Sequence, residues 1–471
     1  MSEKINLTAA LRNDAKLNLK EKLSIVAALS MPAILAQISE IVMQYIDAAM
    51  VGSLGADASA SIGLVSSSTW LINGLMSACA AGFAVQAAHA VGARHYDRAR
   101  KLLKEGIVIS GIFALLLTAA GLVISMYLPQ WLGADQSLWH DATAYFAVFS
   151  AFIPMRVYAT LGVQMLECTG NMKTPAKLQV LACFADVVFN FLLIYPTRTI
   201  TMFGTSFTMV GAGLGVLGAA LGTGLSVVTA GLPLLYITCI KSDVLGLRHD
   251  TSSWKPVADD LIQARNIAIP MGCEQAALSL AQVISTRIVA PLGTIAIAAN
   301  SFAVTAEAIC YMPGYGIGSA ATTMVGQAVG AKRKDLARSF AWLTTATGMI
   351  LMGSISLLMY FICPWVFEFL TPVEEVRVLA EEVLRIELLA EPLFAASIVA
   401  SAALRGAGDT LVPAVLNLVS MWGVRLTLAW TLSKTMGLKG VWIAMASEIC
   451  FRGILFLIRL KREGWLKRLQ D

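Results

Sequence analysis

The chain consists of two copies of one unit. A shift of 238 residues, the separation of Pro32 and Pro270, places the landmarks of the first half on those of the second without a gap. The segment AVGARHYDRAR at 90–100 meets AVGAKRKDLAR at 328–338 with seven of eleven residues identical, and LECTGNMKTP at 166–175 meets LRGAGDTLVP at 404–413. A period this long is not that of a solenoid. The sequence therefore predicts two similar bundles.

The composition places these bundles in a membrane. Of the 471 residues, 57% are hydrophobic and only 14% are charged. Apolar runs of roughly 20 residues, long enough to cross a bilayer as a helix, recur along the whole chain. They predict twelve membrane-spanning helices, at 23–50, 59–91, 105–128, 141–165, 176–195, 209–240, 263–290, 294–329, 340–369, 383–404, 411–433 and 438–460. We expect an all-α integral membrane protein.

Six spans per half is an even number, so both halves enter the membrane in the same orientation. Parallel repeats of this kind are one of the builds found in secondary transporters, with two six-helix lobes around a central cavity. We expect an N-lobe at 1–240, a polar cytoplasmic linker at 241–262, and a C-lobe at 263–471 that ends in a basic cytoplasmic tail.

The distribution of positive charge predicts the orientation. Of 35 Lys and Arg residues, 26 fall in the N-terminus, the alternate loops and the C-terminus. The opposite loops hold only Arg198, Arg377, Lys434 and Lys439. By the positive-inside rule both termini are cytoplasmic in a multi-pass protein of the cell (inner) membrane. No basic cluster resembles a nucleic-acid-binding arm, so the expected partners are the lipid bilayer and small molecules.

The first helix carries an unusual polar face. Gln37, Glu40, Gln44 and Asp47 stand at i, i+3, i+7 and i+10, which places them on one side of a helix. An ionisable side chain at membrane depth costs a few kcal/mol or more, so it normally faces a cavity or a partner. The face therefore lines a cavity or joins helices as polar packing. Asp47, near the outer end, can also reach water.

Polar groups recur in the fifth and sixth helices. Asp186 and Asn190 are one helical turn apart, and Thr223 lies in the sixth helix. Carboxylates with amide and hydroxyl oxygens suit a small hard cation such as sodium, or a proton shared between acids. Residue types do not separate the two uses. Asp186 can also be a hydrogen-bonded packing acid, and for Thr223 alone a bond to its own helix backbone is the better interpretation.

The acids break the symmetry of the repeat. Glu274 follows Pro270 in the seventh helix. The residues that the repeat pairs with Asp47, Asp186 and Glu274 are Ser285, Val424 and Ala36. Because packing residues tend to survive in both copies, unmatched acids are candidates for functional groups.

Two prolines and four charged residues in or near the spans are further candidates. Pro32 and Pro270 are predicted to bend the first and seventh helices. The charged residues Arg156, Arg287, Arg425 and Glu307 are either counter-ions or interface groups.

Together these segments resemble the multidrug and toxic compound extrusion (MATE) transporters, of the bacterial-type multidrug efflux group. The resemblance spans essentially the whole chain. It is carried by PAILAQ and YIDAAMVGSLG in the first helix, AVGARHYDRARK, LECTGNMKTP, ADVVFNFLLIYP in the fifth helix, GVLGAALGT in the sixth, and IPMGCE in the seventh.

The resemblance implies an antiporter that is not an enzyme and uses no cofactor. It would export organic, cationic and amphipathic compounds in exchange for sodium ions or protons, by alternating access and as a monomer. Asp47, Asp186, Asn190 and Thr223 would form the N-lobe cation site, although the commoner order there is asparagine before aspartate. Glu274 would be a second protonatable or substrate-binding group.

The family's second site also uses an acid in the tenth helix. Phe394 occupies that position here, with Glu387 and Glu391 nearby.

Three alternatives remain at the level of sequence. A flippase for lipid-linked precursors has a related build but should show several cationic cavity residues. A major facilitator exporter should show G-x-x-x-D-R-x-G-R-R, whereas the loop after Gly92 differs in length and composition. A membrane-embedded enzyme should show a nucleophile or metal motif, and the sequence has neither H-E-x-x-H nor G-x-S-x-G.

Overall fold

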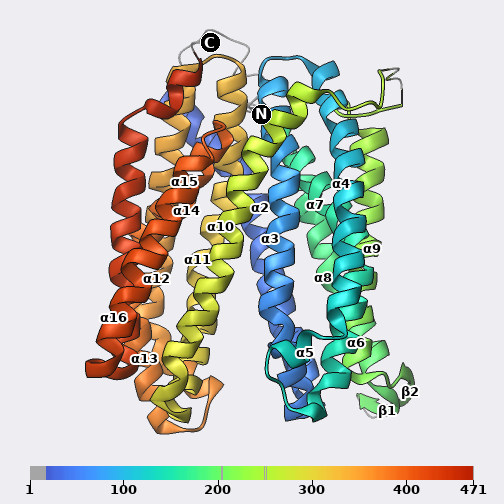
Figure 1. The fold of residues 1–471 in the computed structure, drawn as a ribbon, viewed down its shortest axis with the longest axis vertical. Helices are drawn as coiled ribbons and strands as arrows, with labels where there is room; N and C mark the ends of the chain where they lie inside the picture. The colour runs from blue at the N-terminus through green and yellow to red at the C-terminus, as the bar shows by residue number, and fades with distance from the viewer. Residues whose placement is uncertain (1–16, 203–204, 249, 251, 470–471) are drawn as a thin grey trace.

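The helices form two groups that stand side by side (Figure 1). The computed structural model describes residues 17–202, 205–248, 250 and 252–469. The first sixteen residues of the predicted N-lobe and the last two residues of the predicted basic tail lie outside this range.

The first group holds the N-terminal half of the chain. Its helices are α2 (Leu19–Gly52), α3 (Ala56–Gly92), α4 (Tyr96–Ser125), α5 (Leu128–Trp131), α6 (Trp139–Ala151), α7 (Ile153–Cys168), α8 (Lys173–Ile194) and α9 (Gly215–Tyr236). A five-residue π-helical turn, Ile237–Lys241, extends α9.

The second group holds the C-terminal half. Its helices are α10 (Ala258–Val289), α11 (Thr294–Gly330), α12 (Lys334–Leu370), α13 (Glu374–Leu388), α14 (Glu391–Gly406), α15 (Leu411–Leu418) and α16 (Leu426–Lys461), with a π-helical segment at Val419–Arg425. Helix α10 begins inside the predicted linker at 241–262; the exact lobe boundaries remain a prediction.

The described helices account for the twelve predicted passes. Nine are long and apolar enough to span a membrane, or ten when the bent pair α6 and α7 counts as one span. Helices α13 and α14 supply another pass. The stretch 411–461 supplies two, because the chain leaves helical geometry at Gly437, with φ 61° and ψ −138°.

Two passes break at residues that the repeat pairs. Helices α6 and α7 meet at a bend of 50°, and Pro154 lies in the first turn of α7. Pro392, which lies 238 residues later, occupies the first turn of α14. Proline has no backbone N–H, so it is well tolerated in the first turn of a helix, where no such donor is needed. It cannot bond to the turn before it, so a helix that precedes it tends to end there. Helices α2 and α10 continue through Pro32 and Pro270, and bending there remains a prediction.

An antiparallel hairpin joins α8 to α9, where the sequence analysis expected only helix and loop. Its strands are β1 (Pro196–Met202) and β2 (Thr205–Ala212). Alternating threonine and apolar residues favour strands, and two glycines take positive φ where the strand gives way to helix, Gly213 after β2 and Gly215 at the start of α9. The sixth helix therefore starts later than the predicted residue 209.

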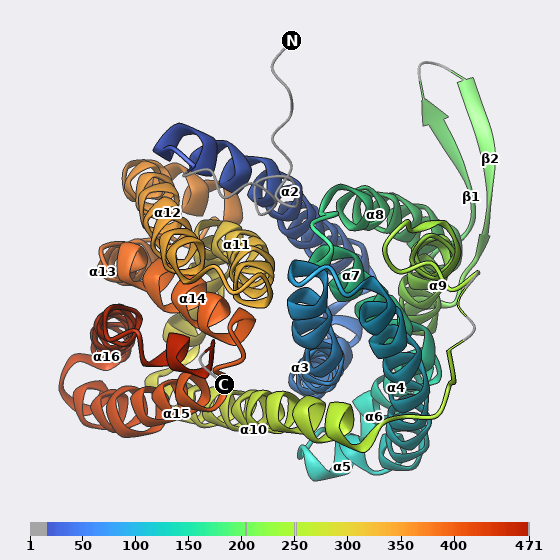
Figure 2. The ribbon, with the colours of Figure 1, turned by 90° about the horizontal axis from the view of Figure 1, so that it is seen from above.

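The molecule has two ends. We call the end at which α3, α7, α11 and α14 terminate the basic face, and the end that carries β1 and β2 the hairpin face. The ribbons of the two groups approach one another near the basic face and stand further apart at the hairpin face (Figure 1). Viewed from above, α3 and α11 face each other near the centre (Figure 2).

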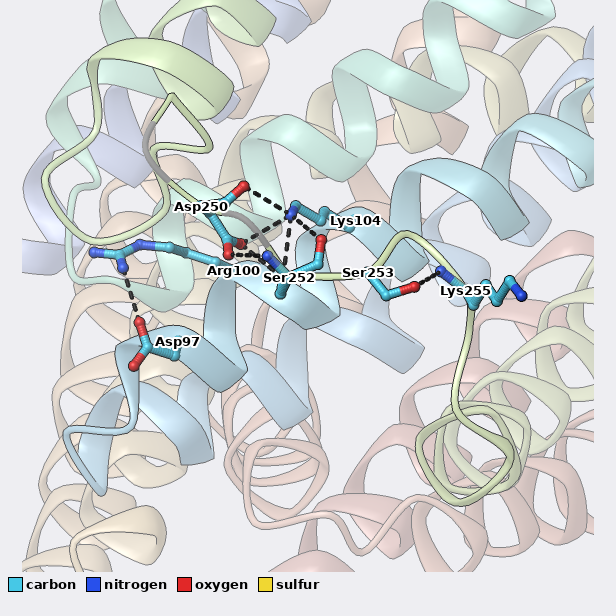
Figure 3. Close-up of polar contacts among 7 residues, drawn as sticks. All are labelled: Asp97, Arg100, Lys104, Asp250, Ser252, Ser253 and Lys255. Atoms are coloured by element: carbon cyan, nitrogen blue, oxygen red, sulfur yellow. Dashed lines mark hydrogen bonds and ion pairs between the residues drawn. The ribbon is translucent and has the colours of Figure 1, made fainter.

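The connection between the lobes is held against α4 (Figure 3). Lys104, which is only 1% exposed, donates to the Ser252 carbonyl at 2.8 Å and to Ser252 Oγ at 3.1 Å, and pairs with Asp250 at 3.1 Å. Glu105 accepts from the Val257 backbone N–H at 3.0 Å. Burial raises the pKa of Asp250, but hydrogen bonds from Ser252 and Lys104 outweigh this and hold the pKa below its usual value.

The Lys104→Met substitution should lower the stability of the purified protein by about 2 kcal/mol, because it removes charged hydrogen bonds from a buried position. Thermal unfolding in detergent measures this. Lys255→Met is the control, since Lys255 is exposed and should leave the transition unchanged. Because the pKa of Asp250 is depressed, its contribution is complete above roughly pH 4 and is lost as pH falls through the lower folded-state pKa.

Candidate functional site

Three predicted residues meet inside the N-lobe. The Asn190 side-chain amide donates to Asp47 Oδ1 at 2.8 Å and to Asp186 Oδ2 at 2.9 Å. Asp47 comes from α2, whereas Asp186 and Asn190 lie one turn apart on α8. Asp186 and Asn190 are 0% and 1% exposed. The amide thus uses both of its N–H groups to join acids from two helices.

The sixth helix contributes a different hydroxyl from the predicted one. Ser226 of α9 shares its hydroxyl hydrogen between the Thr223 carbonyl of its own helix, at 2.8 Å, and Asp186 Oδ1, at 3.2 Å. Thr223 instead donates to the Ala219 carbonyl of its own helix at 3.1 Å, as the alternative interpretation expected. Ser226 follows Thr223 by three residues, so the helical period would have placed both on one side.

Glycines let α9 approach α8 at this point. A Cβ atom on Gly222 would lie 2.0 Å from Asn190 Oδ1, and one on Gly218 would lie 2.4 Å from the Leu193 carbonyl. Small residues permit this close packing of helices in membranes. The glycines of the GVLGAALGT segment therefore position Asn190.

The acids interact with each other as well as with Asn190. The carboxyl groups of Asp47 and Asp186 both lie within hydrogen-bond distance of the same Asn190 nitrogen, at 2.8 and 2.9 Å, so they are neighbours. Neighbouring carboxylates repel each other when both are ionised, and a shared proton or a bound cation relieves this repulsion. Arg156 of α7 lies over the Phe149 ring, 4.8 Å from its centroid, and its interpretation as a counter-ion remains a prediction.

The rest of the polar face lies along α2. Gln37 and Glu40 are partly buried, and Gln44 is exposed. Beside Gln44, the Tyr45 hydroxyl donates to the Thr305 carbonyl of α11 at 2.5 Å. The face therefore adjoins the contact between the lobes.

Glu274 belongs to a separate group in the C-lobe. Its Oε1 accepts from Arg405 Nη2 and from Asn417 Nδ2, both at 2.6 Å. Its Oε2 is buried without a hydrogen-bond partner. The sequence analysis did not select Arg405 or Asn417, although Arg405 lies in the repeated segment at 404–413.

Further acids are buried around the position where Phe394 replaces an acid. Phe394 packs against Tyr311, with ring centroids 5.6 Å apart. Glu307, Glu387 and Glu391 are 6%, 0% and 0% exposed. Neither carboxylate oxygen of Glu387 or of Glu391 has a hydrogen-bond partner. Arg425 is partly buried, and its guanidinium contacts the Met445 sulfur, whereas Arg287 is exposed.

No group of three or more His, Cys, Asp or Glu side chains is arranged to hold a metal ion within the described ranges. Asp47 and Asp186 form a pair joined by the Asn190 amide nitrogen, whereas the Asn190 amide oxygen lies toward Gly222 of α9.

Two repeated bundles of membrane helices, each with buried acids, define a two-lobed membrane transporter as the class. The sequence profile of the MatE family matches residues 32–192 and 270–431. The starts of the two matches differ by the same 238 residues as the repeat. This chain belongs to the MatE family of multidrug efflux transporters.

Relatives extend the match over nearly the whole chain. A probable multidrug resistance protein NorM of Thermotoga maritima is 25% identical, with 93% of this chain and 92% of the relative covered. A probable multidrug resistance protein YoeA of Bacillus subtilis is 22% identical, with 88% of each covered. A crystal structure of MATE in complex with MaL6 has a TM-score of 0.87 at 20% identity, covering 98% of this chain and 99% of that chain.

Membership settles several expectations. The fold and the MATE resemblance are confirmed, and the family consists of transporters, which rules out the membrane-embedded enzyme and the major facilitator exporter. The roles of individual residues are a separate matter.

Asn190→Leu should destabilise the protein by about 2 kcal/mol, because both acids lose a charge-assisted hydrogen bond. Adding Asp186→Asn should recover part of this loss, because it removes the repulsion between Asp47 and Asp186. Thermal unfolding of the two single variants and the double variant measures the coupling. Additive effects would show that Asn190 and Asp186 are not energetically coupled.

Proposed function

We propose that this protein exports organic cations in exchange for sodium ions or protons. Asp47 and Asp186 bind the coupling ion, Asn190 holds the two acids in register, and Ser226 orients Asp186. The drug and the coupling ion compete for the Asp47 carboxylate. The transporter works as a monomer in the cell membrane with the basic face in the cytoplasm.

The binding of Asp47 and Asp186 to one Asn190 amide carries this proposal. Two neighbouring ionised carboxylates repel each other, so a proton, a sodium ion or a cationic substrate stabilises the pair. Carboxylate and amide oxygens suit sodium, and paired carboxyl groups suit a shared proton. The structure supports both ions equally well.

Competition for this site can drive alternating access. A ligand shifts a conformational equilibrium only by binding the two states with different affinity. Asp47 lies on α2, which contacts both α8 in its own lobe and α11 in the other. An ion or a drug bound at Asp47 therefore acts on α2, a helix that contacts both lobes. The acidic character of this group favours cationic substrates over the pyrophosphate of a lipid-linked precursor.

Asp47→Asn should reduce coupled efflux at least about tenfold while the protein stays folded, because the amide cannot exchange a cation. Dye efflux from proteoliposomes, with an imposed sodium gradient and separately with a pH gradient, measures this and identifies the ion. Asp57→Asn is the control, since Asp57 is exposed at the start of α3. Normal efflux by Asp47→Asn under both gradients would refute the proposal.

Ser226→Ala should weaken ion binding several-fold, whereas Thr223→Val should have little effect, because only Ser226 contacts Asp186. The concentration of sodium, or of protons, that gives half-maximal efflux reports this difference. The opposite ranking would return Thr223 to the site and remove Ser226 from it.

A further inference from the structure

Two hydrogen bonds cross between the lobes at the basic face, and the repeat relates them. Gln327 of α11 donates through Nε2 to the Cys168 carbonyl of α7 at 2.7 Å. His89 of α3 lies 2.8 Å through Nε2 from the Gly406 carbonyl of α14, and because a carbonyl only accepts, Nε2 carries the proton. Residues 89 and 327 differ by 238, as do 168 and 406. Each lobe therefore donates to the other in the same way.

The accepting carbonyls are available for the same reason in both lobes. The last carbonyls of a helix have no partner in the helix. After α7, the Gly170 N–H returns to the Glu167 carbonyl at 2.8 Å, and after α14 the Gly408 N–H returns to the Arg405 carbonyl at 2.9 Å. Both glycines have positive φ, 85° and 86°. These turns leave Cys168 and Gly406 to be bonded from the opposite lobe.

Paired glycines bring the helices together at the same place. A Cβ atom on Gly92 would lie 2.0 Å from the Gln327 carbonyl, and one on Gly330 would lie 1.9 Å from the His89 carbonyl. Residues 92 and 330 again differ by 238. Both glycines lie in helix with negative φ, so the backbone itself would accept alanine. The contact between α3 and α11 would not.

One lobe adds further contacts. Ser319 Oγ of α11 donates to Glu167 Oε2 at 2.5 Å, and Thr323 Oγ1 donates to the Glu167 carbonyl at 3.0 Å. With Gln327 these donors stand four residues apart along one side of α11. The repeat places Arg405 at the position of Glu167, and Arg405 binds Glu274 within its own lobe instead.

We propose that His89 and Gln327 form a two-part latch that holds the basic face closed, and that Gly92 and Gly330 set how tightly it closes. The latch rests on the proposed alternating-access function, since it must open for the other state to form. Its bonds end on backbone carbonyls, so the latch acts on lobe position without contacting the Asp47 site. It assigns the repeated segments at 90–100 and 404–413 a role beyond topology.

Distances across the basic face test the latch. Asp97 and Asp335 are related by the repeat, and their side chains are 99% and 62% exposed. Spin labels on Asp97→Cys and Asp335→Cys, after replacement of the eight native cysteines, report the separation without substrate or ion gradient. His89→Ala with Gln327→Ala should raise the population of long distances about tenfold. His89→Gln is the matched control and should keep the short distance, because glutamine still donates.

Alanine at the glycines gives a second measurement. Gly92→Ala and Gly330→Ala should each shift the distances toward the open state. Gly63 lies on α3, as Gly92 does, and a Cβ atom added to it would have no atom within 4 Å. Gly63→Ala should therefore leave the distances unchanged. If neither the donor variants nor the glycine variants change the distances while the protein folds, the latch is refuted.

The test separates failure of the latch from failure of the proposed function. A parent protein that performs ion-coupled efflux, with distances unchanged by all latch variants, refutes the latch alone. Distances that lengthen in the latch variants of a parent that shows no ion-coupled efflux refute the proposed function and support the latch.

Discussion

The N-lobe site depends on the two hydrogen bonds that the Asn190 amide donates to Asp47 and Asp186. Two carboxyl groups from α2 and α8 repel each other when both are ionised, and one amide joins them with both of its N–H groups. The geometry needs the close approach of α9, since any side chain larger than hydrogen at Gly222 would displace the amide oxygen. Packing, hydrogen bonding and charge are therefore set by the same few atoms.

Much of this arrangement follows from the sequence alone. The apolar runs predict the passes, and the helical period predicts that Asp186 and Asn190 share one side of their helix. The period within one helix does not give the rotation of one helix against another, which is why Ser226 was missed in favour of Thr223. The pairing of Glu274 with Arg405 and Asn417 was missed for the same reason, because its partners come from two later passes.

The hairpin and the C-lobe acids were missed for different reasons. The apolar character of residues 209–214 suits a helix as well as a strand, and only the glycine geometry at Gly213 and Gly215 ends the strand. Glu387 and Glu391 were noted as neighbours of Phe394, but their burial depends on the break between α13 and α14. Sequence patterns locate such breaks poorly. Pro392, in the first turn of α14, would be equally compatible with a loop at this position.

The attachment of the interlobe connection to α4 has a mechanical consequence. Lys104, Glu105 and Arg98 of α4 bind residues from Asp250 to Asp260, so the connection and the first turn of α10 are fixed to α4. The contact of α10 with the N-lobe also continues beyond its first turn. Gln86 of α3 donates to the Asp260 carbonyl at 3.1 Å, and a Cβ atom on Gly82 of α3 would lie 2.8 Å from the Ala264 carbonyl. Any movement of the two helix groups against each other therefore has to act on the contact between α3 and α10.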